Sequence, residues 1–291
     1  MPDATPGAAP AERDRILVFI PAYNCAPQVP RVLEQFRRVP DRYFEEVVVV
    51  DNGSRDATMA AAAAALPAVG ARRAMVVRND DNYNLGGSHK AVFAYAEREG
   101  FTHVVCLHGD DQGNILDVLP VLERGDHRRY DACLGARFTG GSKITGYSLF
   151  RRVGNHVFNA VFSVALRRRV TDLGSGLNLF ARSAFAGGAA DRLPDDLHFN
   201  PYFLVSMADR GLRLLFFPIS WREEDQVSNV KMASQAMKTL QAAREFALDK
   251  RTLRTGEHRT RPRDAYAFKV VASHNGGAAN VPRLDAAGVA A

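Results

Sequence analysis

The residues best suited to chemistry stand together at positions 108–112, in the order His-Gly-Asp-Asp-Gln, directly after the apolar run 104–107. An apolar run of that length predicts a buried strand of a parallel sheet. Its polar end would lie at the carboxyl edge, where open α/β folds bind their ligands. Side chains two apart share one face of an extended chain, so His108, Asp110 and Gln112 could form half of a divalent-cation site. A polar turn that caps the next helix explains the same residues.

Three further apolar runs, 16–20, 47–50 and 74–77, also predict strands that end in polar loops. The loops contain Pro21-Ala22-Tyr23-Asn24, Asp51-Asn52-Gly53-Ser54 and Asn84-Leu85-Gly86-Gly87. Segments with helical spacing separate the runs, and this alternation predicts right-handed crossovers and a mostly parallel sheet. Because the carboxyl ends of parallel strands meet at one edge of a sheet, we expect the four loops to lie side by side.

Each loop has a ligand-binding interpretation and a structural one. Asp51 could accept hydrogen bonds from a nucleobase or a ribose, although the Asn-Gly that follows it is also strong turn chemistry. Gly86 and Gly87 could let the backbone approach a diphosphate, with Lys90 one helical turn later to meet its charge. Neither G-x-G-x-x-G after the first or third strand nor G-x-x-x-x-G-K-[ST] occurs, which argues against a nicotinamide dehydrogenase and a P-loop nucleotidase.

The composition is that of a globular protein with anionic partners. The 291 residues are 46% hydrophobic and 24% charged, and the net charge is +6. A basic balance predicts a nucleotide, a phosphate or an anionic membrane surface as partner, and no helix-turn-helix, finger or basic-zipper pattern indicates nucleic acid. Three cysteines without metal-site spacing predict a reduced, cytoplasmic protein. No apolar run reaches the roughly 18 residues of a membrane span.

One α/β domain is expected over residues 15–225, after a disordered leader at 1–14. Residues 226–254 predict a C-terminal amphipathic helix, and residues 255–291, basic and then Gly/Ala-rich, predict a flexible tail. The helical spacing over 149–166, with an apolar middle and basic ends, suits a helix in a membrane interface. An ordinary core helix fits that pattern too, and the sequence leaves the oligomeric state open.

The order of the motifs resembles the family 2 nucleotide-sugar glycosyltransferases, and within them the polyprenyl-phosphate branch similar to dolichol-phosphate mannose synthase. The segments that carry the resemblance are 19–24, 48–54, 84–90 and 107–112, and the likeness spans residues 15–225. It implies a GT-A fold, a single Rossmann-like mostly parallel sheet flanked by helices, here with a C-terminal helical extension. It also implies an inverting transferase that moves a sugar from a nucleoside-diphosphate sugar to a polyprenyl phosphate.

The resemblance assigns roles at the donor site. The donor-binding positions would be Pro21, Ala22, Tyr23, Asn24, Asp51, Gly53, Gly86, Gly87, Lys90, Asp110 and Asp111. The family's metal motif, D-x-D with a Gln two residues on, falls on His108, Asp110 and Gln112. It implies Mn²⁺ or Mg²⁺ as cofactor, and Mn²⁺ is favoured if His108 is a ligand, because imidazole is a poor ligand for Mg²⁺. The sequence departs from the family at His108, where an Asp is usual.

The resemblance also implies an acceptor site. Arg137, which ends a Gly-Ala-Arg stretch, and Arg151 would hold the acceptor phosphate, because a guanidinium offers paired donors; Arg222 is a third cation. A metal on Asp110 would neutralise the departing nucleoside diphosphate. A lipid phosphate needs no general base, whereas a hydroxyl acceptor needs a carboxylate, and Asp172 and Asp196 are the candidates for it. The match degrades at 221–225, where Trp-Arg-Glu-Glu-Asp replaces aromatic-x-x-Arg.

Three alternatives to a lipid-phosphate acceptor stay open. The acceptor could be a hydroxyl of a soluble natural product or saccharide. A nucleotidyltransferase would show a Gly-rich loop with Arg or Lys after the first strand, which residues 21–27 lack. A non-catalytic nucleotide-sugar-binding protein is favoured by His108 but not by Asp110 and the two arginines. A lipid acceptor implies a cytoplasmic protein in peripheral contact with an anionic membrane.

Overall fold

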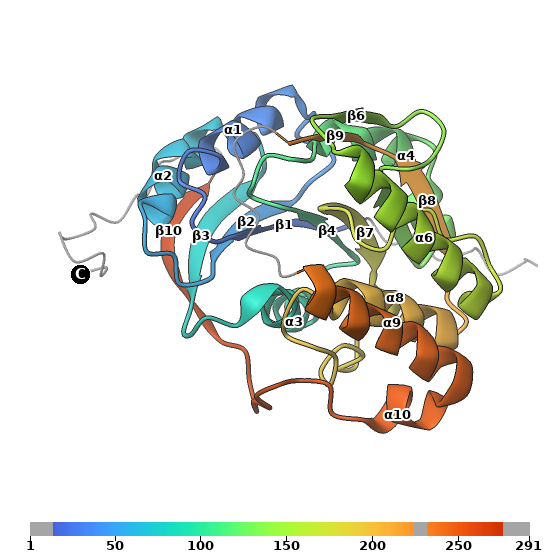
Figure 1. The fold of residues 1–291 in the computed structure, drawn as a ribbon. Coiled ribbons are helices and arrows are strands. Elements are labelled where there is room, and N and C mark those ends of the chain that lie inside the picture. The colour runs from blue at the N-terminus through green and yellow to red at the C-terminus, as the bar shows by residue number, and fades with distance from the viewer. Residues whose placement is uncertain (1–13, 224–231, 276–291) are drawn as a thin grey trace, which may run out of the picture.

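The computed structural model of the chain describes residues 14–223 and 232–275 (Figure 1). Its strands are β1 (Ile16–Ala22), β2 (Glu46–Asp51), β3 (Arg73–Asn79), β4 (His103–Leu107), β5 (Ala132–Ala136), β6 (Lys143–Thr145), β7 (Leu177–Ala181), β8 (Leu214–Pro218), β9 (Ser220–Arg222) and β10 (Phe268–Asn275). Its α-helices are α1 (Val29–Glu34), α2 (Thr58–Ala65), α3 (Asn84–Arg98), α4 (Leu119–Glu123), α5 (Asp126–Arg129), α6 (Leu149–Leu166), α7 (Arg182–Phe185), α8 (Phe199–Asp209), α9 (Met232–Leu248) and α10 (Lys250–Thr255). Short 3₁₀ turns are η1 (Gln35–Arg38), η2 (Leu66–Ala68) and η3 (Ile115–Val118).

In the described part of the chain, eight strands form one mixed sheet in the order β10-β3-β2-β1-β4-β7-β5-β8. The four strands β3, β2, β1 and β4 pair in parallel, as the strand-helix alternation predicts. β7 lies antiparallel between β4 and β5, and a separate parallel pair joins β6 to β9. The predicted α/β fold with a mostly parallel sheet is therefore confirmed, with antiparallel pairing at β7 and β10.

Both faces of the sheet are covered, and the alternation along β1 shows why. Ile16, Val18 and Ile20 pack with α1, α2 and the η3–α4 segment, whereas Leu17 and Phe19 pack with α3 and α8 on the other side. All five side chains are 0–3% exposed. A strand buried on both faces needs apolar residues at every position, which explains the continuous run in the sequence. Figure 1 shows α1 and α2 on one side of the sheet and α3, α8 and α9 on the other.

The structure differs from expectation in three places along the chain, and two of them concern helices. Residues 84–87, predicted to be a loop, form the first turn of α3. The helix predicted for 226–254 is described as α9 and α10, with its beginning outside the described residues.

Beyond residue 255, where a flexible tail was predicted, residues 268–275 form β10 and pair antiparallel with β3. The short apolar run 270–272 gives this segment a face to bury, and the open edge of β3 supplies backbone partners. A tail without structure is therefore wrong for these eight residues. None of the helices in the described ranges has the length and apolar character needed to cross a bilayer.

Candidate active site

The loops after β1, β2 and β4 meet at the carboxyl edge of the sheet, as predicted. The backbone N–H of Asn52 donates to Ala22 O at 2.9 Å, and that of Gly109 donates to Pro21 O at 3.0 Å. A Cβ at Gly109 would lie 3.0 Å from Pro21 O, so a larger residue there would push the two loops apart. These contacts gather residues 21–24, 51–54 and 108–112 around one site.

The two loops predicted to hold the nucleoside are joined to each other. Asn24, in the left-handed region with φ 49°, accepts a hydrogen bond from Arg55 N at 2.9 Å. Asp51 is buried, accepts from Ser54 N at 3.2 Å, and lies 3.7 Å from the guanidinium of Arg78. Gly53 has φ +80°, and a Cβ there would lie in ordinary contact with Asn82 Cβ at 3.9 Å. The arrangement places a buried carboxylate at the carboxyl end of β2, a position that suits recognition of a base or a ribose.

The residues predicted to approach a diphosphate from α3 have structural partners. The N–H groups of Gly86 and Gly87 donate to Asp195 O, at 2.6 and 3.3 Å. Lys90 is buried; its Nζ donates to Asp195 Oδ1 at 2.6 Å and to Leu193 O at 2.5 Å. Burial lowers the pKa of Lys90, and the carboxylate of Asp195 opposes that effect. These contacts tie α3 to the segment before α8, so the diphosphate role of the three residues gains no support from them.

The residues predicted to bind a metal follow the end of β4. Asp110 Oδ1 accepts from Gln112 N at 3.2 Å. His108 is half-buried, its backbone N–H donates to Gly176 O at 2.8 Å, and its Nε2 atom is buried without a hydrogen-bond partner among the described residues. Burial lowers the pKa of His108, which favours the neutral imidazole, the form that binds metals.

The residues at this position fit a divalent cation that shares its coordination with a substrate. Within the described ranges no three His, Cys, Asp or Glu side chains gather as a metal site. One carboxylate, the orphaned imidazole nitrogen of His108 and an amide are nevertheless a suitable protein contribution. Mg²⁺ and related ions commonly take one or two carboxylates and complete their coordination with substrate phosphates and water.

Asp111 anchors the same loop from the opposite side. It is 1% exposed and has φ +61°. Its carboxylate accepts from Arg31 Nε at 2.7 Å and also from Arg222, whose Nε donates to Asp111 O at 3.1 Å. The Arg222 backbone N–H in turn donates to Gln112 O at 3.1 Å. Arg222, predicted to contact the acceptor, and Asp111, predicted to contact the donor, thus fix the loop 108–112 against β9 and α1.

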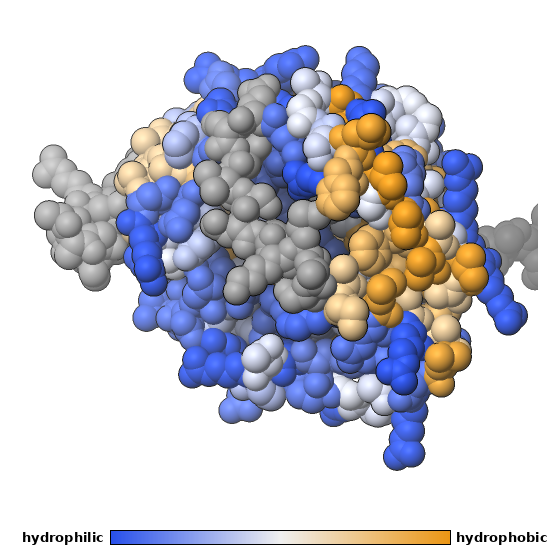
Figure 2. Space-filling view, in the orientation of Figure 1, coloured by the Kyte–Doolittle hydropathy of each residue, from blue (hydrophilic) through white to orange (hydrophobic). Residues whose placement is uncertain are grey.

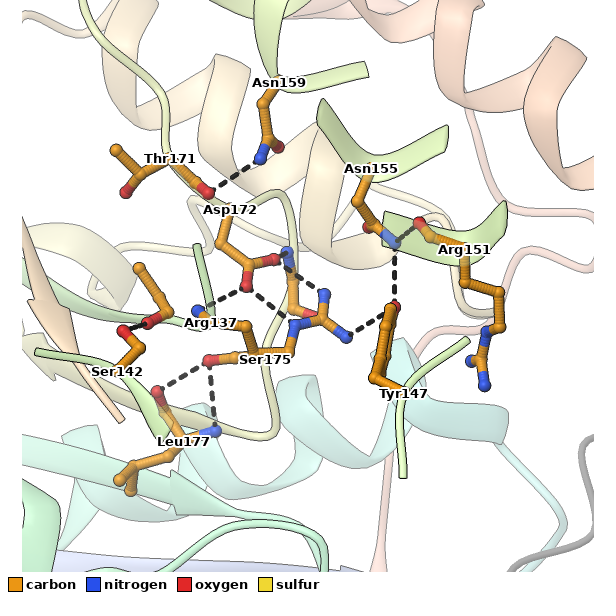
Figure 3. A network of polar contacts seen from close by, with 12 residues as sticks. Arg137, Ser142, Tyr147, Arg151, Asn155, Asn159, Thr171, Asp172, Ser175 and Leu177 are labelled. Atoms are coloured by element: carbon orange, nitrogen blue, oxygen red, sulfur yellow. Dashed lines mark hydrogen bonds and ion pairs between the residues drawn. The ribbon is translucent and has the colours of Figure 1, made fainter. Parts of the chain in front are cut away.

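The first arginine predicted to bind the acceptor phosphate forms a buried ion pair. Arg137 donates from Nε and Nη2 to the two carboxylate oxygens of Asp172, at 2.8 and 2.7 Å, and its backbone N–H also donates to Asp172 at 2.9 Å (Figure 3). Burial opposes the charge of Arg137, but the facing carboxylate outweighs it and raises the pKa of the guanidinium. Three aromatic rings surround this group, and its Cζ lies 4.9 Å from the ring centroid of Trp221 and 5.6 Å from that of Tyr147. Asp172 has its oxygens occupied and is poorly placed to accept a proton from a substrate.

The second predicted arginine lies beside the first. Arg151, in the first turn of α6, pairs with Glu223 at 2.5 Å, and its guanidinium lies 4.8 Å from the centroid of Tyr147. Tyr147 Oη accepts from Asn155 at 2.8 Å and from Arg137 at 3.4 Å, so Tyr147 connects the two arginines (Figure 3). Arg151 keeps 39% of its side chain exposed, and an anionic group could reach it.

The other carboxylate predicted as a base belongs to a loop before α8. Asp196 accepts from the backbone and ring of His198, at 2.9 and 2.7 Å, and lies 3.5 Å from Lys238. Burial raises the pKa of Asp196, but the hydrogen bonds from His198 outweigh it and bring it to about 2. A carboxylate that is so weakly basic accepts a proton poorly at neutral pH.

Several residues of this site were not among those predicted from the sequence. They are Arg31, which holds Asp111, and Tyr147, Trp221 and Glu223, which surround the two arginines. Tyr147 lies between Gly146 and Ser148, the residue that caps the beginning of α6. An aromatic residue directly before a helix cap is a signal in the sequence that could have pointed to it. The pairing of Arg31 with Asp111 joins residues 80 apart and has no local signal.

The model of the family described as "Glycosyl transferase family 2" matches residues 17–187, more than half of the chain. That range includes β1 from its second residue, β2 to β7, and the predicted donor, metal and arginine positions up to Asp172.

Solved structures with the same fold include glucosyl-3-phosphoglycerate synthase from Mycobacterium tuberculosis. Its complex with Mn²⁺, uridine-diphosphate-glucose and phosphoglyceric acid is 18% identical, with a TM-score of 0.60 over 84% of this chain and 86% of that one. Its complex with Mn²⁺, uridine-diphosphate-glucose and glycerol 3-phosphate is 18% identical, with a TM-score of 0.58 over 80% of both chains. A complex with Mg²⁺ and uridine-diphosphate is 16% identical, with a TM-score of 0.58 over 80% and 79%. At these identities the likeness establishes the fold.

Proposed function

The chain belongs to glycosyl transferase family 2, and from that premise we propose that it transfers a sugar, with inversion, from a nucleoside-diphosphate sugar to a polyprenyl phosphate at an anionic membrane surface. As a member of this family it is a nucleotide-sugar glycosyltransferase. The observation that carries the lipid acceptor lies in the first turn of α6. Arg151, one of the two phosphate-type arginines, directly follows Leu149 and Phe150, which are 76% and 74% exposed. A polyprenyl phosphate combines the two chemistries that this turn presents, an anion and an apolar chain.

The state of the carboxylates favours the same acceptor. A hydroxyl nucleophile must lose its proton to a base, whereas a phosphate monoester is already anionic at neutral pH. Asp172 is occupied by Arg137, and the pKa of Asp196 is about 2. Neither candidate base is in the state that proton abstraction requires, and an anionic acceptor needs none.

The donor site would use the joined strand-end loops. Asp51 and the turn at Gly53 would receive the nucleoside, and the loop after β4 would receive the diphosphate. Mn²⁺ or Mg²⁺ would be held by Asp110 with His108 and Gln112, in keeping with the metal complexes of the solved relatives. The bound ion supplies positive charge where the nucleoside diphosphate departs.

The chain's own residues would then mainly position the reactants. Arg31 and Arg222 hold Asp111 and thereby fix the loop that carries Asp110. Arg151, whose guanidinium is positioned by its contacts with the Tyr147 ring and with Glu223, would hold the acceptor phosphate beside the donor. Holding two reactants in line converts a bimolecular step into an effectively unimolecular one, which supplies a large part of the rate.

The test is transfer of a radiolabelled sugar in the presence of Mn²⁺ or Mg²⁺. UDP- and GDP-sugars are incubated with a polyprenyl phosphate in detergent, with 3-phosphoglycerate, or without acceptor, and label is counted in butanol-extractable and aqueous products. We expect metal-dependent label in the butanol phase. Arg151→Gln should lower that rate at least ~10-fold, because one charge-assisted hydrogen bond is worth about 1.5–3 kcal/mol. The adjacent Arg152→Gln is the matched control, with little expected change.

Label found in the aqueous phase alone would refute the lipid acceptor and support a second candidate, a small phosphorylated acceptor. The observation that favours this candidate is that the solved relatives are bound to phosphoglyceric acid and glycerol 3-phosphate. Arg151 would then hold the phosphate of that molecule, and its hydroxyl would be the nucleophile. Release of pyrophosphate would instead indicate a nucleotidyltransferase.

A further inference from the structure

The outward face of α6 is apolar, the reverse of what a surface helix normally presents. Its large side chains that are at least 38% exposed are Leu149, Phe150, Val153, Val157, Val161 and Val164. Leu149 and Phe150 are adjacent, and the four valines follow at intervals of three or four residues, which places them in one stripe along the helix. The 18 residues of α6 extend it over about 27 Å, at about 1.5 Å per residue.

The stripe continues onto the neighbouring helix. α9 packs beside α6 and exposes Met237, Leu240 and Leu248, at 72%, 39% and 79%. Figure 2 shows the result as a band of hydrophobic colour that runs over α6 and reaches α9. We call these nine side chains the α6–α9 band. Monomeric soluble proteins rarely expose contiguous apolar surface of this kind without an interaction partner.

The charged residues on α6 and α9 are mostly basic, although Lys238 lies 3.5 Å from Asp196 and the exposed Asp249 directly follows Leu248. α6 contains no acidic residue, and the only one in α9, Glu245, is buried. Arg167 and Arg169 are exposed at the end of α6, and Lys238 and Arg244 are exposed on α9. An apolar surface with cations at its margin matches an anionic bilayer, whose headgroups attract the cations while the acyl region receives the apolar side chains.

We infer that the α6–α9 band is the surface by which the protein lies on an anionic lipid bilayer. The inference rests on the proposed lipid acceptor, because the band begins at Leu149 and Phe150, next to Arg151. A polyprenyl phosphate held at Arg151 would pass its chain directly along the band into the bilayer. The surface therefore brings the acceptor arginine to the headgroup level, where the acceptor phosphate is.

The test measures binding to vesicles without donor or acceptor. The full chain is sedimented with phosphatidylcholine vesicles and with vesicles that also contain phosphatidylglycerol. We expect binding to the anionic vesicles that weakens with salt. Val157→Asp combined with Val164→Asp should weaken it at least ~10-fold, because charged side chains are strongly disfavoured in the acyl region. Val157→Ser with Val164→Ser is a milder pair that should weaken it less.

The matched control is Val270→Asp, on β10 at the opposite edge of the sheet, where the valine is 55% exposed. Its vesicle binding should equal that of the unaltered chain. Arg169→Gln should weaken binding about 5-fold, since one cation near the surface contributes about 1 kcal/mol. Affinity for UDP with Mn²⁺ should be the same in all variants, which checks that they are folded.

Unchanged vesicle binding in both Val157/Val164 double variants would overturn the inference. So would sedimentation of the unaltered chain as a dimer that the double variants dissociate, together with no vesicle binding, because the band would then join two copies. The outcomes for the lipid acceptor are separate. Band-dependent vesicle binding without sugar transfer to polyprenyl phosphate would reject the proposed function alone, and transfer in micelles without vesicle binding would reject the docking surface alone.

Discussion

Replacing Asp172 by Asn should destabilise the fold far more than an ordinary charge change, because it breaks a buried ion pair. The side chains of Asp172 and Arg137 are 1% and 9% exposed, and two hydrogen bonds of 2.7 and 2.8 Å join them. Removing one partner of such a pair leaves an uncompensated buried charge, at a cost of about 3–5 kcal/mol. For a domain of this size that loss corresponds to a fall in Tm of roughly 6–20 °C. The free energy of unfolding is measured by urea denaturation and the Tm by calorimetry.

Two comparisons separate this cause from others. Glu34→Gln, which breaks the exposed pair with Arg37, should change stability by less than about 1 kcal/mol. Arg137→Met combined with Asp172→Leu should recover much of the loss, because apolar residues of similar volume leave no buried charge. An Asp172→Asn protein as stable as the original but inactive in sugar transfer would refute the reasoning and restore Asp172 as a base.

Further expectations concern packing, pH and the donor site. Gly86→Ala should lower the free energy of unfolding in urea by about 1–3 kcal/mol, because the new Cβ would lie 2.3 Å from Pro194 O. Gly154→Ala, where the Cβ would meet open space in α6, should raise it by about 0.5–1 kcal/mol. Equal effects of the two substitutions would contradict this packing. Burial lowers the pKa of His89 from 6.5 to about 3, so as the pH falls below 6.5 the unfolded chain takes up a proton that the folded chain does not, and stability falls. His89→Leu should reduce the difference in the free energy of unfolding between pH 7 and pH 5 by about 2 kcal/mol. An unaltered difference would refute this. Asp110→Ala should abolish the Mn²⁺ dependence of UDP binding in calorimetry without changing Tm; retained dependence would exclude Asp110 as a ligand.

The parts of the fold that follow from local pattern were predictable. Apolar runs at β1, β2, β3 and β4, each followed by a polar loop and a helical segment, fixed a parallel arrangement and one edge where the loops meet. The reason is geometric, since strands linked by crossovers all point the same way. The bounds of α6 agree with the predicted 149–166, because its apolar spacing is strong and Ser148 caps its beginning.

Other features depended on contacts that no local pattern announces. β7 pairs antiparallel with β4, and β10 pairs antiparallel with β3. The composition of the segment that contains β10 had predicted a flexible tail. Backbone hydrogen bonds offered by an open sheet edge decide such pairings, and the sequence of the joining strand carries little of that information.

The sequence by itself determined which residue types stand at the strand ends and, through their order, the family of the enzyme. Only the tertiary structure decided what each of them contacts. Lys90 forms an ion pair with Asp195, Arg137 with Asp172 and Arg222 with Asp111, and each pair joins residues more than 30 positions apart in the chain. A buried charge without an opposite charge beside it destabilises the fold by several kcal/mol. Which residue becomes its partner depends on how the helices and strands pack. For that reason the apolar stripe of α6 could be read from its spacing, but its exposure could be seen only once the helices that cover the core were in place.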